Sequence, residues 1–471
     1  MKKLLIILIL SYLPLIGYSQ DYQRQNYALA KKKTDVLINQ FLKEANIPGI
    51  SVAISKDNKL IYSNSFGFSD LEHKSPATNN TKFRIASVTK LLTAVATVKL
   101  IESGIIQKDD SLQKYFNDLP EAYQKITIAQ LAGHLSGIRH YTEEEIFSSN
   151  TKNYSNLRDV FEKFINDTLL FAPGYKYKYS SYGYVLLGAV LESAKKENFN
   201  DIITEYILRP AGLFNTLPEK YNVAIDNLTK FYYPQKEGDG FTIPEAENYS
   251  YKWSAGAYLS TASDLALFGS ALVSGKIVDT TYLPLLFTPQ KTNNGSEILC
   301  GFGFRIGTDW KGRKVVYHGG ESEGSRAFFL IYPEQRLTIA LLANVFRAPL
   351  FEGEAETIAG YFLNDYSWKE QIISPGKYSY TALNKDKPMK SEINIEKNYG
   401  IISNFNGRDV PIVDIVLDSD KIRIIGTARN GIINIWIYPE KNRYIGYWGY
   451  DKPKNEFIII EFVKEKNTEN K

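Results

Sequence analysis

The sequence predicts a mixed α/β (α+β) domain followed by a small antiparallel β domain, and three stretches indicate this class. Residues 49–68, "GISVAISKDNKLIYSNSFGF", hold two runs of β-branched and apolar residues around a "KDNK" turn, as in a hairpin. Residues 83–104, "FRIASVTKLLTAVATVKLIESG", read as one apolar helix. Beyond Pro375 strand follows strand, as in "PIVDIVL", "KIRIIGT" and "EFIIIEFV". We therefore expect a separate C-terminal β domain at residues 375–471.

The stretches between these regions predict further short elements. A short helix that ends in a loop is expected at residues 126–138, and a loop that turns into an apolar helix at 179–196. Residues 218–252 are polar, aromatic and irregular. A helix with an N-cap signal follows at 259–275, and three short strands occupy 315–344.

Composition argues against several function classes. Lys and Arg number 56 and Asp and Glu 52, so the formal net charge of +4 gives no indication of a nucleic-acid surface. Four histidines and one cysteine leave little material for a His/Cys metal site, and no histidine pair has the spacing of a zinc protease. We therefore expect no metal, no cofactor and no nucleic-acid partner.

Residues 1–19 have the layout of a secretory signal peptide. Two lysines precede an apolar run of roughly a dozen residues, and Gly17 and Ser19 offer small residues at a cleavage site. A membrane anchor is the alternative, but the run is shorter than the ~20 residues that span a bilayer. We expect export with cleavage, no transmembrane span in the mature chain, and a periplasmic or secreted location.

Ser87 and Lys90 form an S-x-x-K pattern near the start of the apolar helix. Residues i and i+3 are neighbours on a helix, so both side chains project to one side. Helix N-termini favour negative charge, and desolvation lowers a lysine pKa until the amine can accept a proton. A weak hydroxyl nucleophile needs such a neighbour. The alternative is that Ser87 caps the helix while Lys90 extends to water.

Five stretches occur in an order that is typical of one enzyme superfamily. They are "TKFRIASVTKLLTAVATVKLIESG", "ITIAQLAGHLSGI", "PGYKYKYSSYGYVLLGAVLE", "WSAGAYLSTASDLALF" and "YHGGESEGSRAFFLIYPEQRLTIALLAN". Over residues 35–365 the chain resembles the serine β-lactamase and penicillin-binding-protein superfamily, within its class C, D-Ala-D-Ala carboxypeptidase and esterase branch. The resemblance implies a β-lactamase/transpeptidase-like domain at residues 20–368, with an antiparallel sheet flanked by helices and an inserted helical subdomain.

The resemblance also implies a role for each motif residue. Ser87 is the expected acylated nucleophile, and Lys90 is expected to help deprotonate it. Tyr179 is expected to share the base role and to protonate the leaving group. His318 stands where many relatives have the lysine of K-T-G and esterase-like ones have histidine. The oxyanion hole is expected to use the backbone N–H groups of Ser87 and Glu321.

Three further residues are expected to contact the substrate. Gly319 and Gly320 suit a strand that lies close to it. Ser181 replaces the Asn of the family's tyrosine motif, which puts recognition of a substrate amide in question. His318 removes a permanent positive charge where substrates present a carboxylate. His134, in the loop "GHLSG", is expected to be a buried structural residue.

The sequence thus predicts an exported serine hydrolase that cleaves an amide or ester bond through an acyl-enzyme. We expect an activity like that of a D-Ala-D-Ala carboxypeptidase or an esterase, with weak or no β-lactamase activity. The substrate is expected to be a small molecule or peptide, and peptidoglycan-derived peptides are one candidate. The alternative is a cell-wall peptide-binding protein that keeps the fold without turnover. The sequence gives no indication of the oligomeric state.

Overall fold

The computed structural model describes residues 27–147, 151–235, 238, 240–349, 351–367, 372–383, 388–397, 399–405, 408–418, 421–440, 443–449 and 459–464. The chain forms two compact units, one of Asn46–Phe351 and one of the residues up to Ala45 together with those from Glu352 onward. The predicted signal peptide lies outside the described residues. The domain boundaries expected from the sequence stay predictions.

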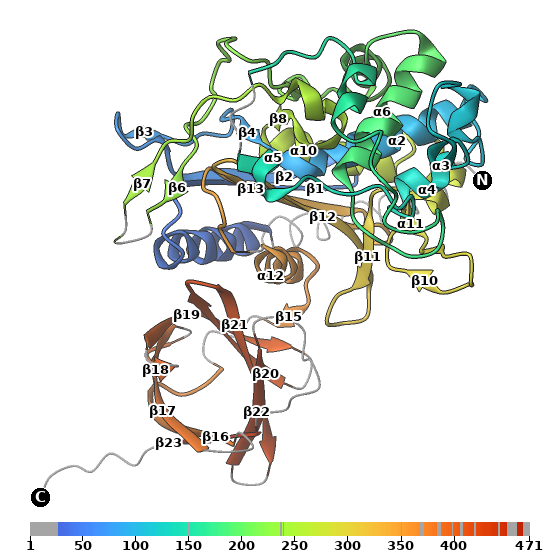
Figure 1. Cartoon of the computed structure of the whole chain (residues 1–471). Helices are drawn as coiled ribbons and strands as arrows, with labels where there is room; N and C mark the ends of the chain where they lie inside the picture. The colour runs from blue at the N-terminus through green and yellow to red at the C-terminus, as the bar shows by residue number, and fades with distance from the viewer. Residues whose placement is uncertain are drawn as a thin grey trace, which may run out of the picture. The chain divides into compact units, whose positions relative to one another are not determined.

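A seven-stranded antiparallel sheet organises the described part of the first unit, as predicted, in the order β11-β12-β13-β14-β1-β2-β3. Its strands are β1 (Gly49–Lys56), β2 (Lys59–Asp70), β3 (Ser75–Pro76), β11 (Arg305–Thr308), β12 (Lys314–Ser322), β13 (Ser325–Tyr332) and β14 (Leu337–Ala343). Strand β1 pairs with β2 on one side and with β14 on the other, so both ends of the unit's chain meet in this sheet (Figure 1). Asp57 and Asn58 turn the predicted hairpin with positive φ values of 49° and 62°, as a type I′ turn requires.

The helical part of the first unit lies between β3 and β11 in the chain. Its longer helices are α2 (Thr89–Glu102), α6 (Ser181–Lys195) and α10 (Ala262–Val273). Its shorter elements are β4 (Phe83–Arg84), η1 (Ala86–Val88), η2 (Leu112–Lys114), α3 (Glu121–Gln124), α4 (Ile128–Ala132), α5 (Glu143–Phe147), η3 (Arg158–Lys163), α7 (Phe199–Ile203), η4 (Thr204–Leu208), α8 (Arg209–Ala211), β5 (Leu217–Pro218), β6 (Tyr233–Pro234), β7 (Phe241–Thr242), η5 (Tyr249–Lys252), α9 (Trp253–Gly256), β8 (Tyr258–Ser260), η6 (Thr280–Tyr282), α11 (Leu283–Phe287), β9 (Gln290–Lys291) and β10 (Glu297–Ile298).

The predicted single helix over residues 83–104 is wrong at its start. Phe83 and Arg84 are extended and form β4, which pairs with β8. A 3-10 turn, η1, then separates this strand from α2. Ser87 therefore lies in a turn between a strand and a helix, and not on the helix itself.

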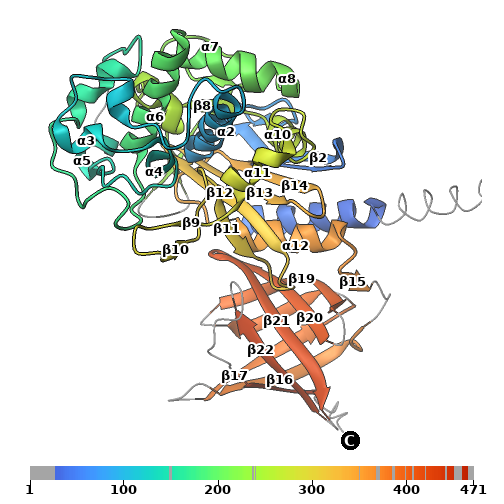
Figure 2. The same ribbon diagram turned by 90° about the vertical axis from the view of Figure 1, so that its right-hand side faces the viewer.

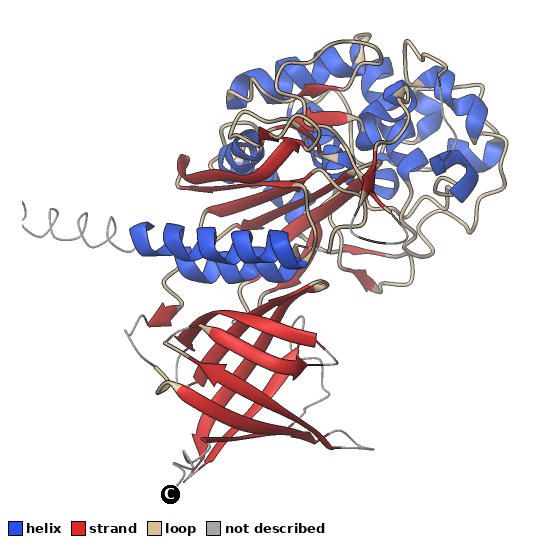
Figure 3. Ribbon diagram, turned by 90° about the vertical axis from the view of Figure 1, so that its left-hand side faces the viewer, coloured by secondary structure: helices blue, strands red, loops and turns tan. Residues whose placement is uncertain are grey.

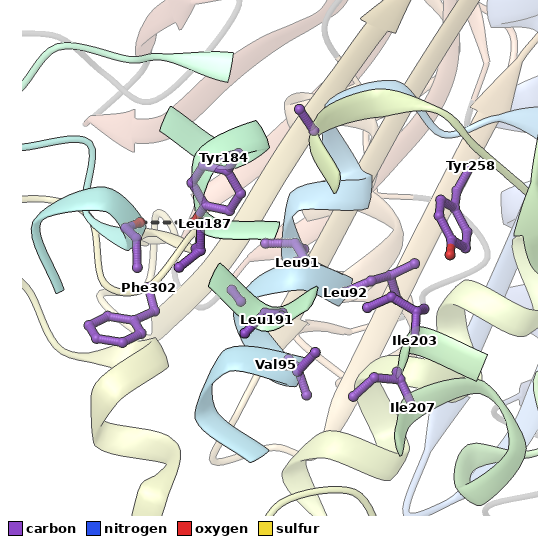
Figure 4. Packing of buried hydrophobic residues seen from close by; sticks show 14 of the residues in the cluster. Leu91, Leu92, Val95, Tyr184, Leu187, Leu191, Ile203, Ile207, Tyr258 and Phe302 are labelled. Atoms are coloured by element: carbon purple, nitrogen blue, oxygen red, sulfur yellow. Dashed lines mark hydrogen bonds between the residues drawn. The ribbon is translucent and has the colours of Figure 1, made fainter. Parts of the chain in front are cut away.

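Helix α2 is buried along almost its whole length, because its residues are apolar on every side. Leu91 and Val95 pack in one cluster with Leu187 and Leu191 of α6 (Figure 4). Tyr184 lies in the same cluster. Helix α10 covers the sheet at β1, where Ser55 Oγ donates to the Ala266 carbonyl oxygen at 2.5 Å. The start of α2, with Lys90, is thus fixed by packing on several sides.

The second unit contains a closed antiparallel sheet. Strands β16 (Gly376–Leu383), β17 (Pro388–Ile395), β18 (Gly400–Phe405), β19 (Arg408–Asp418), β20 (Lys421–Ala428), β21 (Gly431–Glu440), β22 (Arg443–Gly449) and β23 (Ile459–Lys464) pair in sequence, β23 pairs back to β16, and β15 (Tyr366–Ser367) adds to β19. Figure 2 shows these strands crossing one another obliquely. Isoleucine and valine side chains dominate its core. The predicted C-terminal antiparallel sheet is confirmed.

Two helices accompany this closed sheet within the second unit. They are residues 27–44 and α12 (Glu352–Phe362), and after α12 the described elements are all strands (Figure 3). Lys33 forms an ion pair with the buried Asp414 of β19. Arg423 of β20 is fully buried and donates to Thr357 of α12 at 3.1 Å. These contacts tie both helices to the sheet.

Across the described residues, we find no helix that is long and apolar enough to cross a membrane.

Candidate active site

Ser87 occupies a strained turn in front of α2. It is the middle residue of η1, and Ala86 before it has a positive φ of 47°. A non-glycine residue in this region costs about 1–3 kcal/mol and is typical of functional sites. Hydrogen bonds hold the turn, because Ile85 N–H donates to the Tyr258 carbonyl oxygen at 3.0 Å and Val88 N–H donates to that of Ile85 at 3.0 Å. The turn presents the Ser87 side chain, half-buried, at the start of α2.

Lys90 is fully buried one turn further on and contacts Ser87. Its Nζ lies 3.2 Å from Ser87 Oγ and donates to the Ala255 carbonyl oxygen at 2.6 Å. Burial lowers the pKa of Lys90 well below its usual value, and the charges of Lys252 and Arg305 lower it further. The amine can therefore lose its proton at a lower pH than a solvated lysine, and its lone pair can then take the Ser87 proton.

Tyr179 completes a hydrogen-bonded group at Ser87 Oγ. Its hydroxyl donates to Oγ at 2.9 Å, and Lys90 Nζ lies 5.0 Å from the centroid of its ring. Burial raises the pKa of Tyr179, and the hydrogen bond to Ser87 and the charge of Arg305 offset this only in part. The phenol stays protonated at neutral pH. The pKa directions favour Lys90 as the base and Tyr179 as the group that passes the proton onward, and the shared base role expected for Tyr179 stays a prediction.

Strand β12 brings the glycines of the predicted substrate strand beside the nucleophile turn. A Cβ on Gly320 would lie 2.3 Å from the Ile85 carbonyl oxygen, whereas nothing lies within 4 Å of a Cβ built on Gly319. Glycine at position 320 thus lets β12 pass close to the turn. Gly319 borders open space. Glu321 follows on the same strand, and its carboxylate binds Arg326 at 2.5 Å.

His318 is buried and held in one tautomer. Its Nδ1 lies 2.6 Å from the Gly319 carbonyl oxygen, which can only accept, so Nδ1 carries the proton and Nε2 presents a lone pair. Burial and the charges of Lys90 and Arg305 lower the pKa of His318 to about 3. His318 is therefore neutral at working pH. It can accept a hydrogen bond from a substrate, but it offers no positive charge to a carboxylate.

Ser181, the first residue of α6, is buried, and its hydroxyl lowers the pKa of Tyr179. The N–H groups at a helix start have no partner within the helix. Here Ser180 N–H donates to Nδ1 of His134 at 3.2 Å, and Ser181 N–H donates to Nδ1 of His140 at 3.1 Å. His134 is buried and supports the start of α6, as a structural residue does.

Arg305 is a residue near Ser87 that no sequence motif singled out. It lies on β11 opposite Tyr317 of β12, is exposed, and has no ion-pair partner within the described chain. Its charge lowers the pKa of Lys90 and of His318. The pairing of β11 with β12 brings it to this position. A hairpin prediction for "RIGTDWKGRKVVYHGG" is the signal that could have found it.

A buried group of charges supports the turn that follows Glu321. Arg84 donates to both carboxylate oxygens of Glu219 at 2.8 Å and to the carbonyl oxygen of Glu323 at 2.6 Å. Lys252 Nζ lies 3.4 Å from the Glu323 carboxylate. These contacts link β4, η5 and the β12–β13 turn, so they fix β12 relative to the nucleophile turn. Sequence reasoning missed this group, because its members lie far apart in the chain.

Among the residues that the structure describes, no three His, Cys, Asp or Glu side chains converge as metal ligands.

Comparison with known proteins assigns this arrangement to a family. The model of the beta-lactamase family matches residues 34–361, well over half of the chain. This chain belongs to the beta-lactamase family. It is 30% identical over 401 residues to the human protein "Serine beta-lactamase-like protein LACTB, mitochondrial", with 66% of this chain and 73% of that protein covered. The family consists of serine hydrolases, and this member is a serine hydrolase.

Solved structures of other proteins have the same fold as this beta-lactamase family member. The octameric penicillin-binding protein homologue from Pyrococcus abyssi matches with a TM-score of 0.62 and 22% identity, over 92% of this chain and 99% of that chain. The D-amino acid amidase from Ochrobactrum anthropi SV3, complexed with D-phenylalanine, matches with a TM-score of 0.61 and 21% identity, over 72% of this chain and 98% of that chain.

Proposed function

We propose that this family member opens amide or ester bonds through an acyl-enzyme formed on Ser87. One observation carries the proposal, namely that Lys90 Nζ lies 3.2 Å and Tyr179 hydroxyl oxygen 2.9 Å from Ser87 Oγ. A buried lysine with a lowered pKa opposes folding at neutral pH, since the amine must lose its proton or remain charged without water. Activation of the Ser87 nucleophile is a function that accounts for a buried lysine at position 90.

In acylation, Lys90 takes the hydroxyl proton of Ser87 while Oγ forms a bond to the acyl carbon of the substrate. The carbonyl oxygen becomes an oxyanion, and the N–H groups of Ser87 and Glu321 donate to it. The proton passes from Lys90 through the Tyr179 hydroxyl to the leaving nitrogen or oxygen as its bond to the acyl carbon breaks. In deacylation, water adds to the acyl carbon, its proton returns by the same groups, and the acid leaves Ser87.

We propose a peptide substrate that ends in a D-amino acid with a free carboxylate, as in peptidoglycan-derived peptides. Arg305 supplies an exposed positive charge for that carboxylate, which the neutral His318 does not. The charge of Arg305 lies on β11, one strand beyond β12, so it favours binding of an extended peptide over a compact β-lactam. Weak or no β-lactamase activity is the expected consequence. The fold likeness to a D-amino acid amidase is consistent with this substrate class.

We also propose that the protein is exported and that residues 1–19 are removed. The basic start, the apolar run and the small residues at the cleavage site support this. Mass spectrometry of the N-terminus after cell fractionation tests it. A protein that begins at Gln20 and is found outside the cytoplasm fits the proposal, whereas a cytoplasmic protein that retains residues 1–19 contradicts it.

Active-site labelling tests the proposed chemistry. The purified protein and its Ser87→Ala variant are incubated with a fluorescent penicillin and with a fluorophosphonate probe, and turnover of p-nitrophenyl esters is followed in parallel. Labelling of the wild type by either probe, lost in the variant, is the expected result. No label from either probe contradicts the proposal and favours the non-hydrolytic binding protein. Label that survives in Ser87→Ala contradicts Ser87 as the nucleophile.

A further inference from the structure

Three of the four histidines of this chain surround Tyr179. The ring centroids of His134, His140 and His318 lie 4.5, 5.4 and 6.1 Å from that of Tyr179. His134 and His318 are each only 2% exposed, whereas His140 is half-buried. His140 is therefore the one of these three imidazoles that a ligand can most readily reach.

One hydrogen bond decides which nitrogen of His140 carries the proton. Ser181 N–H donates to Nδ1 at 3.1 Å, so Nδ1 must hold a lone pair. Burial and the charge of Lys90 lower the pKa of His140 to about 4, so the ring is neutral at working pH and its proton lies on Nε2. The stack on Tyr141, at 4.9 Å between centroids, holds the ring in place.

The donor on His140 is available for a ligand. Nδ1 faces the start of α6, so Nε2–H, on the other side of the ring, faces away from that helix. No hydrogen bond joins Nε2 to another residue in the described part of the chain. Ser181 is buried, and its hydroxyl interacts with Tyr179 and Tyr141, so this serine has no comparable reach.

We propose that His140 determines specificity by donating its Nε2–H to the carbonyl oxygen of the first amide on the acyl side of the substrate. The acyl side follows from the layout. Arg305 and β12 bind the carboxylate end of the substrate. His140 lies in the loop after α4, on the helical side of Ser87. This inference rests on the proposed function and narrows its substrates to N-acylated amino acids and peptides.

Two substitutions separate this role from support of the helix start. In His140→Asn the side-chain oxygen takes the place of Nδ1 and still accepts from Ser181 N–H, but the donor at Nε2 is lost. In His140→Gln the amide nitrogen takes the place of Nε2, so the donor remains while the acceptor at Nδ1 is lost. A purely structural role predicts that the Asn variant behaves as wild type. A role in specificity predicts that the Asn variant loses activity toward substrates that carry the amide.

The test compares kcat/KM for three p-nitrophenyl esters of equal chain length, those of N-acetylglycine, 4-oxopentanoic acid and pentanoic acid. The first two have a carbonyl oxygen at the position of the acyl-side amide, and the third has none. We expect wild type to prefer the first two. In His140→Asn this preference falls roughly 10-fold, the effect of losing one hydrogen bond to a buried acceptor. In His140→Gln we expect it to survive, with a lower unfolding midpoint.

The results of this test that would overturn the inference are the following. No wild-type preference for the two carbonyl esters overturns the inference, whether or not the variants fold. An equal loss on all three esters in His140→Asn also overturns it, since that result indicates a general defect. A wild type that turns over none of the esters, with no label from either probe on Ser87, overturns the proposed function and this inference with it. A wild type that is active without preference overturns the inference alone.

Discussion

A single methyl group added at Gly320 tests whether β12 must lie against the nucleophile turn. In Gly320→Ala the new Cβ would stand 2.3 Å from the Ile85 carbonyl oxygen and 3.2 Å from the Cβ of Ala327. An ordinary C···O contact is about 3.3 Å, so the strand or the turn must move by roughly 1 Å. A misplacement of this size costs on the order of 100-fold in rate. We therefore expect kcat/KM for a p-nitrophenyl ester to fall about 100-fold.

Gly319→Ala is the matched control for this change. It adds the same methyl group one residue earlier, where nothing lies within 4 Å. We expect its thermal unfolding midpoint, followed by circular dichroism, to equal that of wild type, while that of Gly320→Ala falls. Wild-type kcat/KM together with a wild-type midpoint in Gly320→Ala would refute the close approach of β12 to Ser87.

Further predictions concern the buried charges. The folded pKa of Lys90 lies below its unfolded value, so the residue opposes folding at neutral pH. Lys90→Met should therefore leave the urea midpoint of unfolding no lower than that of wild type. The same variant should abolish labelling of Ser87 in a gel assay. For the same reason kcat/KM of wild type should fall about tenfold per pH unit below the folded pKa of Lys90, and a kcat/KM that rises as the pH falls would contradict this base. Arg305→Gln should raise KM for peptides with a free terminal carboxylate but not for their amides, in steady-state kinetics. Burial raises the pKa of Glu247 to about 7, so its neutral form favours folding below pH 4.5 and this contribution is lost as the pH rises through 7; Glu247→Gln should therefore raise the urea midpoint at pH 8 but not at pH 4.5.

The elements that sequence reasoning predicted well are those with strong local patterns. The hairpin at residues 49–68 forms β1 and β2, with its turn at Asp57 and Asn58. The strands after residue 375 form one sheet. The predicted start of the nucleophile helix was wrong because Phe83 and Arg84 carry large side chains that fit a buried strand as well as a helix. Pairing with β8, far along the chain, decides between the two.

The candidate site could be predicted only where one segment carries it. Ser87 and Lys90 are three residues apart, so the expected helical spacing indicated their contact, although Ser87 lies in η1, just before α2. The positions of Arg305 and His140 depend on the β11–β12 pairing and on the packing of a loop at the start of α6. No local pattern holds that information. The pKa order of Lys90 and Tyr179 likewise follows from burial in the folded chain.

Peptide mapping of the acyl-enzyme tests the central claim most directly. Wild-type protein is treated with a fluorophosphonate, digested with trypsin and analysed by mass spectrometry. Trypsin cuts after Arg84 and Lys90, so Ser87 falls in the peptide "IASVTK". We predict one adduct, on Ser87 of this peptide, that is absent in Ser87→Ala. It should also be absent in Lys90→Met, where loss of the tryptic site extends the Ser87 peptide to Lys99. An adduct on another residue, or equal labelling of Ser87 without Lys90, would contradict the account.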